Sequence, residues 1–352
     1  MRKTWAAGLA LSLAFAGFAS AQDISVGVAG PMTGPEASFG TQLKNGAEAA
    51  LADINAAGGV MGRKLKLEVG DDACDPKQAR AVGEKFASQK LPFVAGHYCS
   101  SSSIPASEAY AEGNVLQITP ASTNPVFTER KLWNTFRVCG RDDQQGRVGA
   151  DYIAEKFPGR AVAVIHDKSA YGKGLADFAK ARLNDKGVTE VMYEAITQGD
   201  KDFGALISKM KAARVDVIYF GGYHTEAGLM VRQAREQGLT AALVSGDALV
   251  TQEFWSITGP AGEGTFMTFD ADPRKNPIAA PLVAKFRAQG YDPEGYTLYT
   301  YAAVQVYAQA VTRARSTKLK DVLKVMQTAT FDTVLGLISF NAKGDEIGRA
   351  HV

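Results

Sequence analysis

The segment GHYCSSSS, residues 96–103, carries side chains that could do three kinds of chemistry. His97 and Cys99 are two positions apart, so on a strand they would share a face as a base beside a nucleophile. The four serines that follow could instead open a helix whose N-terminus binds an anion. Cys99 could also be a structural cysteine in a polar loop. The compartment of the protein and the positions of its other cysteines decide among these interpretations.

Residues 1–21 are typical of an export signal. Arg2 and Lys3 precede an apolar run, and Ala19-Ser20-Ala21 has the small-x-small pattern of a signal-peptidase site. The apolar run is too short for a membrane anchor. A lipid anchor is not expected either, because no cysteine lies near the cleavage region. We therefore expect cleavage after Ala21 and a soluble exported protein that begins near Gln22.

The composition predicts a two-domain globular protein without affinity for polyanions. The chain has 352 residues, of which 46% are hydrophobic, so a sizeable core is expected. Without Arg2 and Lys3 the 39 basic residues become 37, which equals the 37 acidic residues. This balance gives no case for binding nucleic acid or an anionic membrane. A sensor domain tethered by a membrane helix is disfavoured, because no later apolar run could span a bilayer.

The three cysteines are Cys74, Cys99 and Cys139, and in an oxidising compartment two of them are expected to pair. Cys74 and Cys99 are the favoured pair, because both follow predicted strands and so lie near one edge of a sheet. Cys139 is then expected to be a buried, small apolar residue. A hydrolase that uses Cys99 with His97, or a serine with a histidine, is the enzyme alternative. An oxidised Cys99 could not act as its nucleophile.

Short apolar runs alternate with amphipathic runs of helical length, which predicts parallel sheets with right-handed crossovers. The alternation begins afresh near residue 142, and no long flexible linker separates the two units. We therefore predict an α/β protein with two Rossmann-like lobes and a ligand cleft between them. The expected strands lie near residues 24–29, 64–69, 92–96, 115–119, 161–166, 188–195, 215–222 and 241–247.

The segments that follow these strands should line the cleft, because ligands bind beyond the carboxyl ends of strands in open α/β sheets. They are rich in hydroxyls, tyrosines and glycines, and they lack the spacing of metal ligands and the glycine-rich phosphate loops. No metal and no cofactor are expected. Besides GHYCSSSS, the segments are GPMTGPEASFG, TPAST, HDKSAYG, GGYHTE and SGDA.

Six motifs of the chain resemble the periplasmic branched-chain amino acid binding proteins, which are the Leu/Ile/Val receptors of ABC importers. The motifs are DDACDPKQ, GHYCSSS, ITPAST, HDKSAYGKGLA, YFGGYH and RQAREQGL, and the resemblance is collinear from about residue 23 to 345. It implies the type I periplasmic binding fold, with two lobes joined by a multi-strand hinge. The implied N-terminal lobe comprises residues 23–139 and 270–345, and the C-terminal lobe residues 140–269.

The resemblance also implies the Cys74–Cys99 disulfide and a set of ligand contacts. Ser100 would bind the carboxylate of an amino acid, and Asp247 would bind its ammonium group. The other implied contacts are the Ala121 carbonyl, the Thr123 hydroxyl, the tyrosines Tyr171 and Tyr223, and the wall residues Phe39 and Tyr98. Tyr296 falls near a further wall position of the family, but the sequence aligns with the family pattern there only across a gap of one residue.

Two residues depart from the family pattern. The Leu/Ile/Val receptors usually have Glu at the position of Asp247, and Asp is one methylene shorter. They often have Leu at the position of Tyr98, where a phenol would narrow or polarise the side-chain pocket. His97, His166 and His224 are expected to have structural roles.

A zwitterionic amino acid fits this residue set. Its carboxylate is stabilised by hydroxyls and N–H groups at a helix N-terminus, which Ser100–Ser103 would supply. Its ammonium group is stabilised by a carboxylate and a carbonyl, and charge-assisted hydrogen bonds of this kind are strong. Ligand would then bridge the lobes and favour their closure.

The resemblance therefore implies a monomeric, non-catalytic receptor that delivers a branched-chain L-amino acid to an inner-membrane ABC permease in the periplasm. The alternative is a receptor for another small amino acid or for an amide- or urea-like solute. The resemblance ends near Asp345. Residues 346–352 do not look like a strand and are expected to be a non-native tail, with the natural C-terminus missing.

Overall fold

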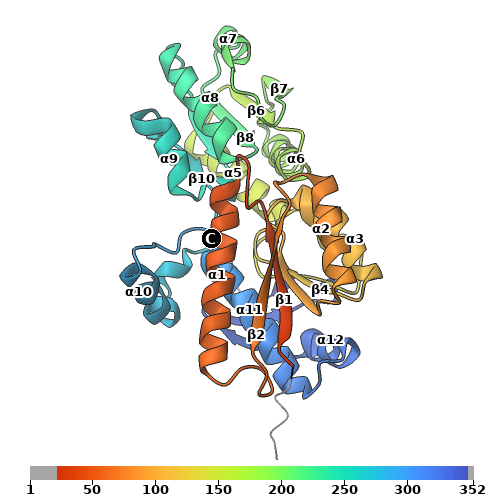
Figure 1. Cartoon of the computed structure of the whole chain (residues 1–352). Helices are drawn as coiled ribbons and strands as arrows, with labels where there is room; N and C mark the ends of the chain where they lie inside the picture. Colours follow the sequence, from red (N-terminus) through yellow and green to blue (C-terminus); the bar gives the residue numbers. More distant parts are fainter. Residues whose placement is uncertain (1–21, 348–352) are drawn as a thin grey trace, which may run out of the picture.

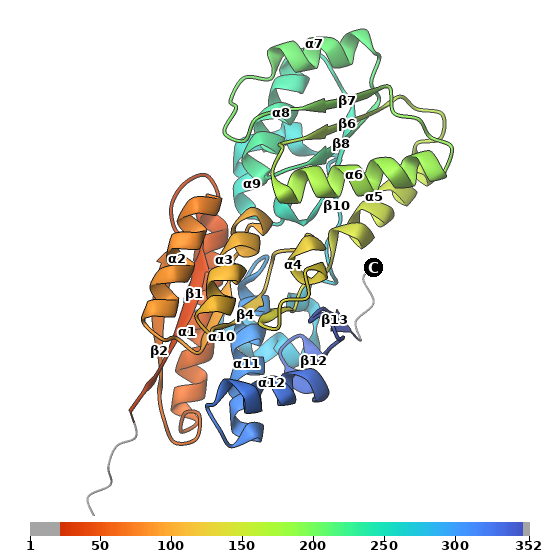
Figure 2. The ribbon, with the colours of Figure 1, turned by 90° about the vertical axis from the view of Figure 1, so that its right-hand side faces the viewer.

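The computed structural model describes residues 22–347, so the predicted signal peptide and residues 348–352 lie outside the described residues. The described chain contains two five-stranded parallel sheets and a small antiparallel sheet, in two lobes (Figure 1). This confirms the predicted α/β fold class. Figure 2 shows the lobes as separate layered bodies joined where α5 and β10 pass between them.

The N-terminal lobe is built on a sheet with strand order β2-β1-β3-β4-β5. Helices α1 and α11 pack on one face of this sheet, and α2 and α3 on the other (Figure 1). Up to the first crossing, its elements are β1 (Ile24–Gly30), α1 (Ala37–Ala56), β2 (Leu65–Asp71), α2 (Pro76–Ser88), β3 (Phe93–Gly96), α3 (Ser100–Glu112), β4 (Leu116–Thr119), α4 (Val126–Glu129) and β5 (Thr135–Arg137).

The C-terminal lobe is built on a sheet with strand order β10-β9-β8-β6-β7. Helices α5 and α6 lie on one face, and α7, α8 and α9 on the other (Figure 2). The elements are α5 (Asp142–Lys156), β6 (Val162–His166), α6 (Ala170–Asp185), β7 (Met192–Ala195), α7 (Gly204–Ala212), β8 (Val217–Gly221), α8 (His224–Glu236), β9 (Ala242–Ser245), a 3₁₀-helix (Asp247–Leu249), α9 (Gln252–Thr258), a 3₁₀-helix (Gly259–Gly262) and β10 (Phe266–Met267).

The chain then returns to the N-terminal lobe, where Lys285 of α10 forms an ion pair with Asp53 of α1. The elements change lobe after β5 and after β10, while the residue boundaries 139/140 and 269/270 stay predictions. The remaining elements are the 3₁₀-helices Pro273–Lys275 and Pro277–Ala279, α10 (Ala280–Ala288), α11 (Thr297–Ala314), α12 (Leu319–Thr328), β11 (Phe331–Thr333), β12 (Gly336–Phe340) and β13 (Glu346–Ile347).

Strand β13 corrects the expectation that no strand follows Asp345. It pairs antiparallel with β12, with Ser339 opposite Ile347 and Phe340 opposite Glu346. A strand of two residues is too short to show a periodic pattern in its sequence. The formation of β13 therefore depends on pairing with β12 rather than on its own sequence. The rest of the predicted non-native tail lies outside the described residues, and its origin stays a prediction.

Strand β6 shows how the sequence fixes the layers of the second lobe. Val162 and Val164 belong to the core on the α5 and α6 side, whereas Ala163 and Ile165 belong to the core on the α7 and α8 side. Because strand side chains alternate between faces, an uninterrupted apolar run is expected only for a strand covered on both faces. Each fully buried aliphatic side chain contributes roughly 1.5–3 kcal/mol by leaving water.

Local capping signals place the helix starts that surround the cleft. The Asp75 side chain accepts hydrogen bonds from the N–H groups of Lys77 and Gln78, 2.9 and 2.8 Å long, and Pro76 occupies the first turn of α2. The Ser169 hydroxyl accepts a 2.8 Å hydrogen bond from Gly172 at the start of α6. Such N-caps each stabilise a helix by about 1 kcal/mol. Within residues 22–347 no helix is long and apolar enough to cross a membrane.

Candidate ligand-binding site

A small cavity lies between the lobes, at the carboxyl ends of strands from both sheets. Parallel strands bring their carboxyl-terminal loops to one sheet edge, and the two sheets present these edges to each other. Its lining comes from the loops after β3, β4, β6, β8 and β9 and from the start of α11. The lining residues are Tyr98, Ser100, Ala121, Tyr171, Tyr223, Asp247, Ala248 and Tyr296.

Asp247 is the buried carboxylate of the cavity. The Tyr171 hydroxyl donates a 2.8 Å hydrogen bond to its Oδ1 atom, and the Tyr296 hydroxyl donates a short hydrogen bond to its Oδ2 atom. Burial raises the pKa of Asp247 above its usual value, against the opposing effect of the hydrogen bonds from Tyr296 and Tyr171. A carboxylate held in this way is suited to pair with a cationic group that enters the cavity.

A second buried carboxylate, Asp142, lies behind Asp247 at the start of α5. The Asp247 N–H donates a 3.2 Å hydrogen bond to Gln145 Oε1, and Gln145 Nε2 donates a 3.4 Å hydrogen bond to Asp142 Oδ1. Burial raises the pKa of Asp142 well above its usual value, and the charge of Asp247 adds to this effect. The two acids therefore disfavour each other's ionisation, and a cation near them would relieve that repulsion.

Ser100 also lines the cavity and is the first residue of α3. Its hydroxyl accepts a 3.2 Å hydrogen bond from the Asn124 N–H. The helix N-terminus presents backbone N–H groups and a partial positive charge, which favour an anionic group. Thr123 is buried beside Asp142 and accepts a 3.0 Å hydrogen bond from the Asp142 N–H through its carbonyl.

Aromatic rings form a further part of the cavity wall. Phe39 stacks on Tyr98 with ring centroids 4.2 Å apart, so Phe39 supports the wall from behind. Tyr98 in turn lies 5.7 Å from Tyr296 and 6.0 Å from Tyr223 by ring centroids. The Tyr223 hydroxyl is buried and has no hydrogen-bond partner among the described residues. Buried hydroxyls are normally hydrogen-bonded, so this group is a candidate contact for a ligand.

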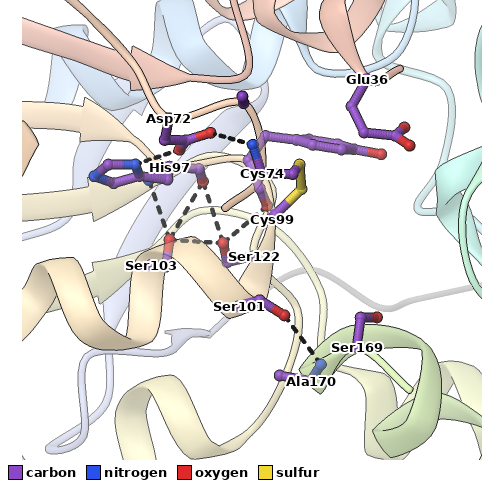
Figure 3. Close-up of a disulfide and its surroundings, with 12 residues drawn as sticks. Glu36, Asp72, Cys74, His97, Cys99, Ser101, Ser103, Ser122, Ser169 and Ala170 are labelled. Carbon is purple, nitrogen blue, oxygen red and sulfur yellow. Dashed lines mark hydrogen bonds and ion pairs between the residues drawn. A yellow bond between two sulfur atoms is a disulfide. The ribbon is translucent and has the colours of Figure 1, made fainter. Parts of the chain in front are cut away.

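The predicted disulfide joins Cys74 and Cys99 directly before Ser100 (Figure 3). Asp72 connects it to His97: its Oδ1 accepts a 2.8 Å hydrogen bond from the Cys74 N–H, and its Oδ2 lies 2.5 Å from His97 Nδ1. The other ring nitrogen of His97 lies 2.9 Å from the Tyr110 hydroxyl. Both ring nitrogens are thus engaged in a buried network that fixes the loop before α3.

A buried arginine at the lobe crossing holds the loop that contains Ala121. Arg137 donates hydrogen bonds of 2.8 Å to the Ser122 carbonyl and 3.0 Å to the Asn124 carbonyl. Its charge is balanced by Asp345, whose Oδ1 lies 2.7 Å from Arg137 Nε. The sequence does not indicate this pair, because its members are far apart in the chain and neither follows a local pattern.

Six of the eight candidate contacts line the cavity, and Phe39 and Thr123 lie behind it. Tyr296 and Ala248 complete the lining. The family resemblance indicated Tyr296, in an alignment that needs a gap of one residue. Ala248 is the residue directly after Asp247 in the chain. Gln145 and Asp142 carried no signal in the sequence. No cluster of metal-ligating side chains occurs within the described residues. The ligand contacts of all eight residues stay predictions.

Comparisons with known proteins agree with this architecture. Residues 23–350 match the family model described as "Periplasmic binding protein". The "Leu/Ile/Val-binding protein homolog 1" of Brucella suis is 52% identical over 348 residues, which cover 98% of this chain and 94% of that protein.

Two solved structures are similar over most of their length. The leucine binding protein LivK of Thermotoga maritima has a TM-score of 0.85 at 27% identity, covering 92% of this chain and 93% of that one. The branched-chain amino acid transporter substrate binding protein LivJ of Streptococcus pneumoniae, solved with isoleucine, has a TM-score of 0.84 at 27% identity, with the same coverage. The chain therefore belongs to the periplasmic binding protein family and has the two-lobed fold of its branched-chain amino acid receptors.

Proposed function

We propose that the protein is the receptor of an ABC importer, which closes on a branched-chain L-amino acid and delivers it to an inner-membrane permease. The observation that carries this proposal is the composition of the cavity lining. It combines the buried carboxylate of Asp247, Ser100 at a helix N-terminus, and several aromatic rings. These three kinds of group match the ammonium, carboxylate and side chain of an amino acid. The Leu/Ile/Val-binding name of the Brucella relative and the isoleucine complex of the Streptococcus protein support it.

In the proposed complex, Asp247 and the Ala121 carbonyl receive the ammonium group, and Ser100 with the first N–H groups of α3 receives the carboxylate. Tyr223 and Tyr171 contact the ligand from the second lobe. Ligand then contacts both lobes at once. It stabilises the closed state by the amount by which it binds the closed state more tightly than the open state.

The proposed location is the periplasm, after cleavage of the chain following Ala21. The family match and the sequence of residues 1–21 support this location.

We also propose that the protein has no catalytic activity. Cys99 is oxidised, so it is no nucleophile, and the His97 ring contacts Asp72 and Tyr110 rather than a serine hydroxyl.

A second candidate ligand is a smaller amino acid or an amide, because two lining residues, Tyr98 and Asp247, depart from the family pattern. Tyr98 occupies space that a leucine side chain would use, and the short Asp247 side chain leaves its carboxylate farther from an ammonium group.

A thermal-shift screen tests both candidates. The probes are L-leucine, L-isoleucine, L-valine, L-alanine, glycine, acetamide and urea, each added to the purified protein. We expect a rise in Tm with the branched-chain acids, because a ligand at 100 times its Kd stabilises the folded state by about 2.7 kcal/mol. A rise only with alanine, glycine or an amide would establish the second candidate. No rise with any probe would contradict the amino-acid receptor.

A further inference from the structure

His224 lies between two carboxylates that come from different lobes. Its Nδ1 atom is 3.1 Å from an oxygen of Glu36, which precedes α1 in the N-terminal lobe. Its Nε2 atom is 3.1 Å from an oxygen of Glu253 in α9 of its own lobe. The side chains of His224 and Glu36 are 0% and 1% exposed, whereas Glu253 is half-exposed. The Glu36–His224 contact therefore spans the closed cleft. Figure 3 shows the Glu36 carboxylate pointing away from the disulfide.

The two contacts have the distances of ion pairs without hydrogen-bond geometry, because His224 Nδ1 and both Glu36 carboxylate oxygens have no hydrogen-bond partner among the described residues. Two carboxylates 3.1 Å from the ring still attract a positive charge placed between them. This position therefore favours the imidazolium form of His224, which carries one proton more than the neutral ring.

The surroundings of His224 favour this extra proton. The Phe39 ring meets the His224 ring edge-on, with centroids 5.4 Å apart, and helps to exclude water. Burial would lower the pKa of His224, but the neighbouring Glu36 and Glu253 raise it above its usual value. Two more buried acids lie near Glu36: burial raises the pKa of Asp167 to about 6 and that of Glu226 to about 7, with a further contribution from the charge of Glu36.

We propose that Glu36 and His224 form a clasp between the lobes, and that closure of the cleft is coupled to proton uptake there. This inference rests on the proposed function, because it describes how the closed, ligand-bound state is held. Both residues act by stabilising closure, since neither lines the cavity.

The sign of the pH dependence follows from the separation of the clasp. In an open state Glu36 moves away with its lobe, whereas Glu253 stays beside His224 because it belongs to the same lobe. In the closed state the pKa of His224 lies above its usual value, and Glu36 is the stronger of the two carboxylates that raise it. We therefore expect closure to raise this pKa. Its contribution to closure is therefore complete below the open-state pKa and is lost as the pH rises through the closed-state pKa. Asp167 and Glu226 act in the same direction, because the charge of Glu36 from the other lobe adds to the burial that raises their pKa values.

Isothermal titration calorimetry with L-leucine and L-valine, between about pH 5.5 and about pH 8.5, tests the clasp. Titrations in two buffers of different ionisation enthalpy measure the protons taken up on binding. We expect uptake by the wild type and affinity that increases as the pH falls, by at most about tenfold per pH unit for one linked proton. His224→Gln should remove most of this uptake and weaken binding at low pH. Glu36→Gln, a change in the other lobe, should do the same.

His166→Gln is the matched control. His166 lies in the same lobe, where its Nδ1 accepts a 3.1 Å hydrogen bond from the Lys168 N–H, away from Glu36. It should keep the wild-type proton uptake. Asp142 and Asp247 remain in every variant, so their contribution to the pH dependence cancels in the comparison.

NMR gives a second readout: the His224 ring signal, assigned by its absence in His224→Gln, should titrate at higher pH with ligand than without. Unchanged proton uptake in both clasp variants, or a ligand-independent titration of His224, would overturn the clasp. Failure of the wild type to bind any amino acid at any pH would instead overturn the proposed function.

Discussion

Asp247 is the residue on which the proposed recognition of an ammonium group depends most. We expect Asp247→Ala to weaken amino-acid binding by at least about a hundredfold, because removing one partner of a buried ion pair costs about 3–5 kcal/mol. Tyr171→Phe removes one hydrogen bond to a charged group and should cost about 1.5–3 kcal/mol. Titration calorimetry of both variants with the same amino acid measures the difference. Equal losses in the two variants would argue against the ammonium role of Asp247.

Tyr98 should set the size of the side chain that the cavity accepts. We expect Tyr98→Leu to improve binding of L-leucine relative to L-alanine by about tenfold, because a burial of two further methylenes is worth roughly 1.6 kcal/mol. The competition of the two amino acids for the variant and for the wild type gives this ratio directly. Phe39→Leu is the control, since Phe39 contacts Tyr98 from behind the wall. If both variants keep the wild-type ratio, Tyr98 does not select by size.

The sequence predicted the candidate residues that follow strands, and it missed those that act through them. Ser100, Tyr223 and Asp247 stand directly after apolar runs, where the topology of a parallel sheet brings them to one edge. Gln145 bonds to Asp247, and Asp142 bonds in turn to Gln145, from a helix in the middle of the chain. These contacts depend on how α5 packs against the loop after β9 within the C-terminal lobe, which periodicity along the chain does not encode.

At the scale of elements, the eight expected strands were predictable as short apolar runs, and the helices between them as amphipathic runs with a period of about 3.6. Helix α1, for example, buries Phe39, Leu43, Ala47 and Ala50 in succession. The short strands β10 and β13 have two residues each, so they carry no such signal. Their existence depends on partners that are distant in sequence, β9 for β10 and β12 for β13.

The disulfide joins the loop after β2 to the loop after β3 and closes a segment with a sequence separation of 25 residues. We expect the double change Cys74→Ser and Cys99→Ser to lower the free energy of unfolding by about 3.5 kcal/mol on the loop-entropy estimate. Denaturant unfolding of the variant and the wild type measures it. Cys139→Ala keeps the disulfide and should cost about 1 kcal/mol. If the double variant were as stable as Cys139→Ala, the result would contradict the predicted stabilisation of the fold by the disulfide.

At the scale of the whole molecule, the closed cleft is held by direct contacts between the lobes as well as by the cavity. At the start of α6, the Ala170 N–H donates a 3.0 Å hydrogen bond to the Ser101 hydroxyl (Figure 3). The Ala170 carbonyl accepts a 2.6 Å hydrogen bond from Asn124. Farther along the cleft, Glu294 accepts a 2.8 Å hydrogen bond from the Gln252 N–H at the start of α9. Opening would return these groups to water, so they contribute to the closed state alone.

Ser101→Ala gives the cleanest test of this contribution. The change removes the cross-lobe hydrogen bond, which is worth about 0.5–1.5 kcal/mol, so we expect amino-acid affinity to fall by roughly two- to twelvefold. The Tm of the ligand-free protein should stay the same, because the open state lacks the bond. Ser208→Ala is the matched control, since the Ser208 hydroxyl bonds only within α7, to the Gly204 carbonyl. If Ser101→Ala lowered the ligand-free Tm and left affinity unchanged, the bond would stabilise the fold rather than closure.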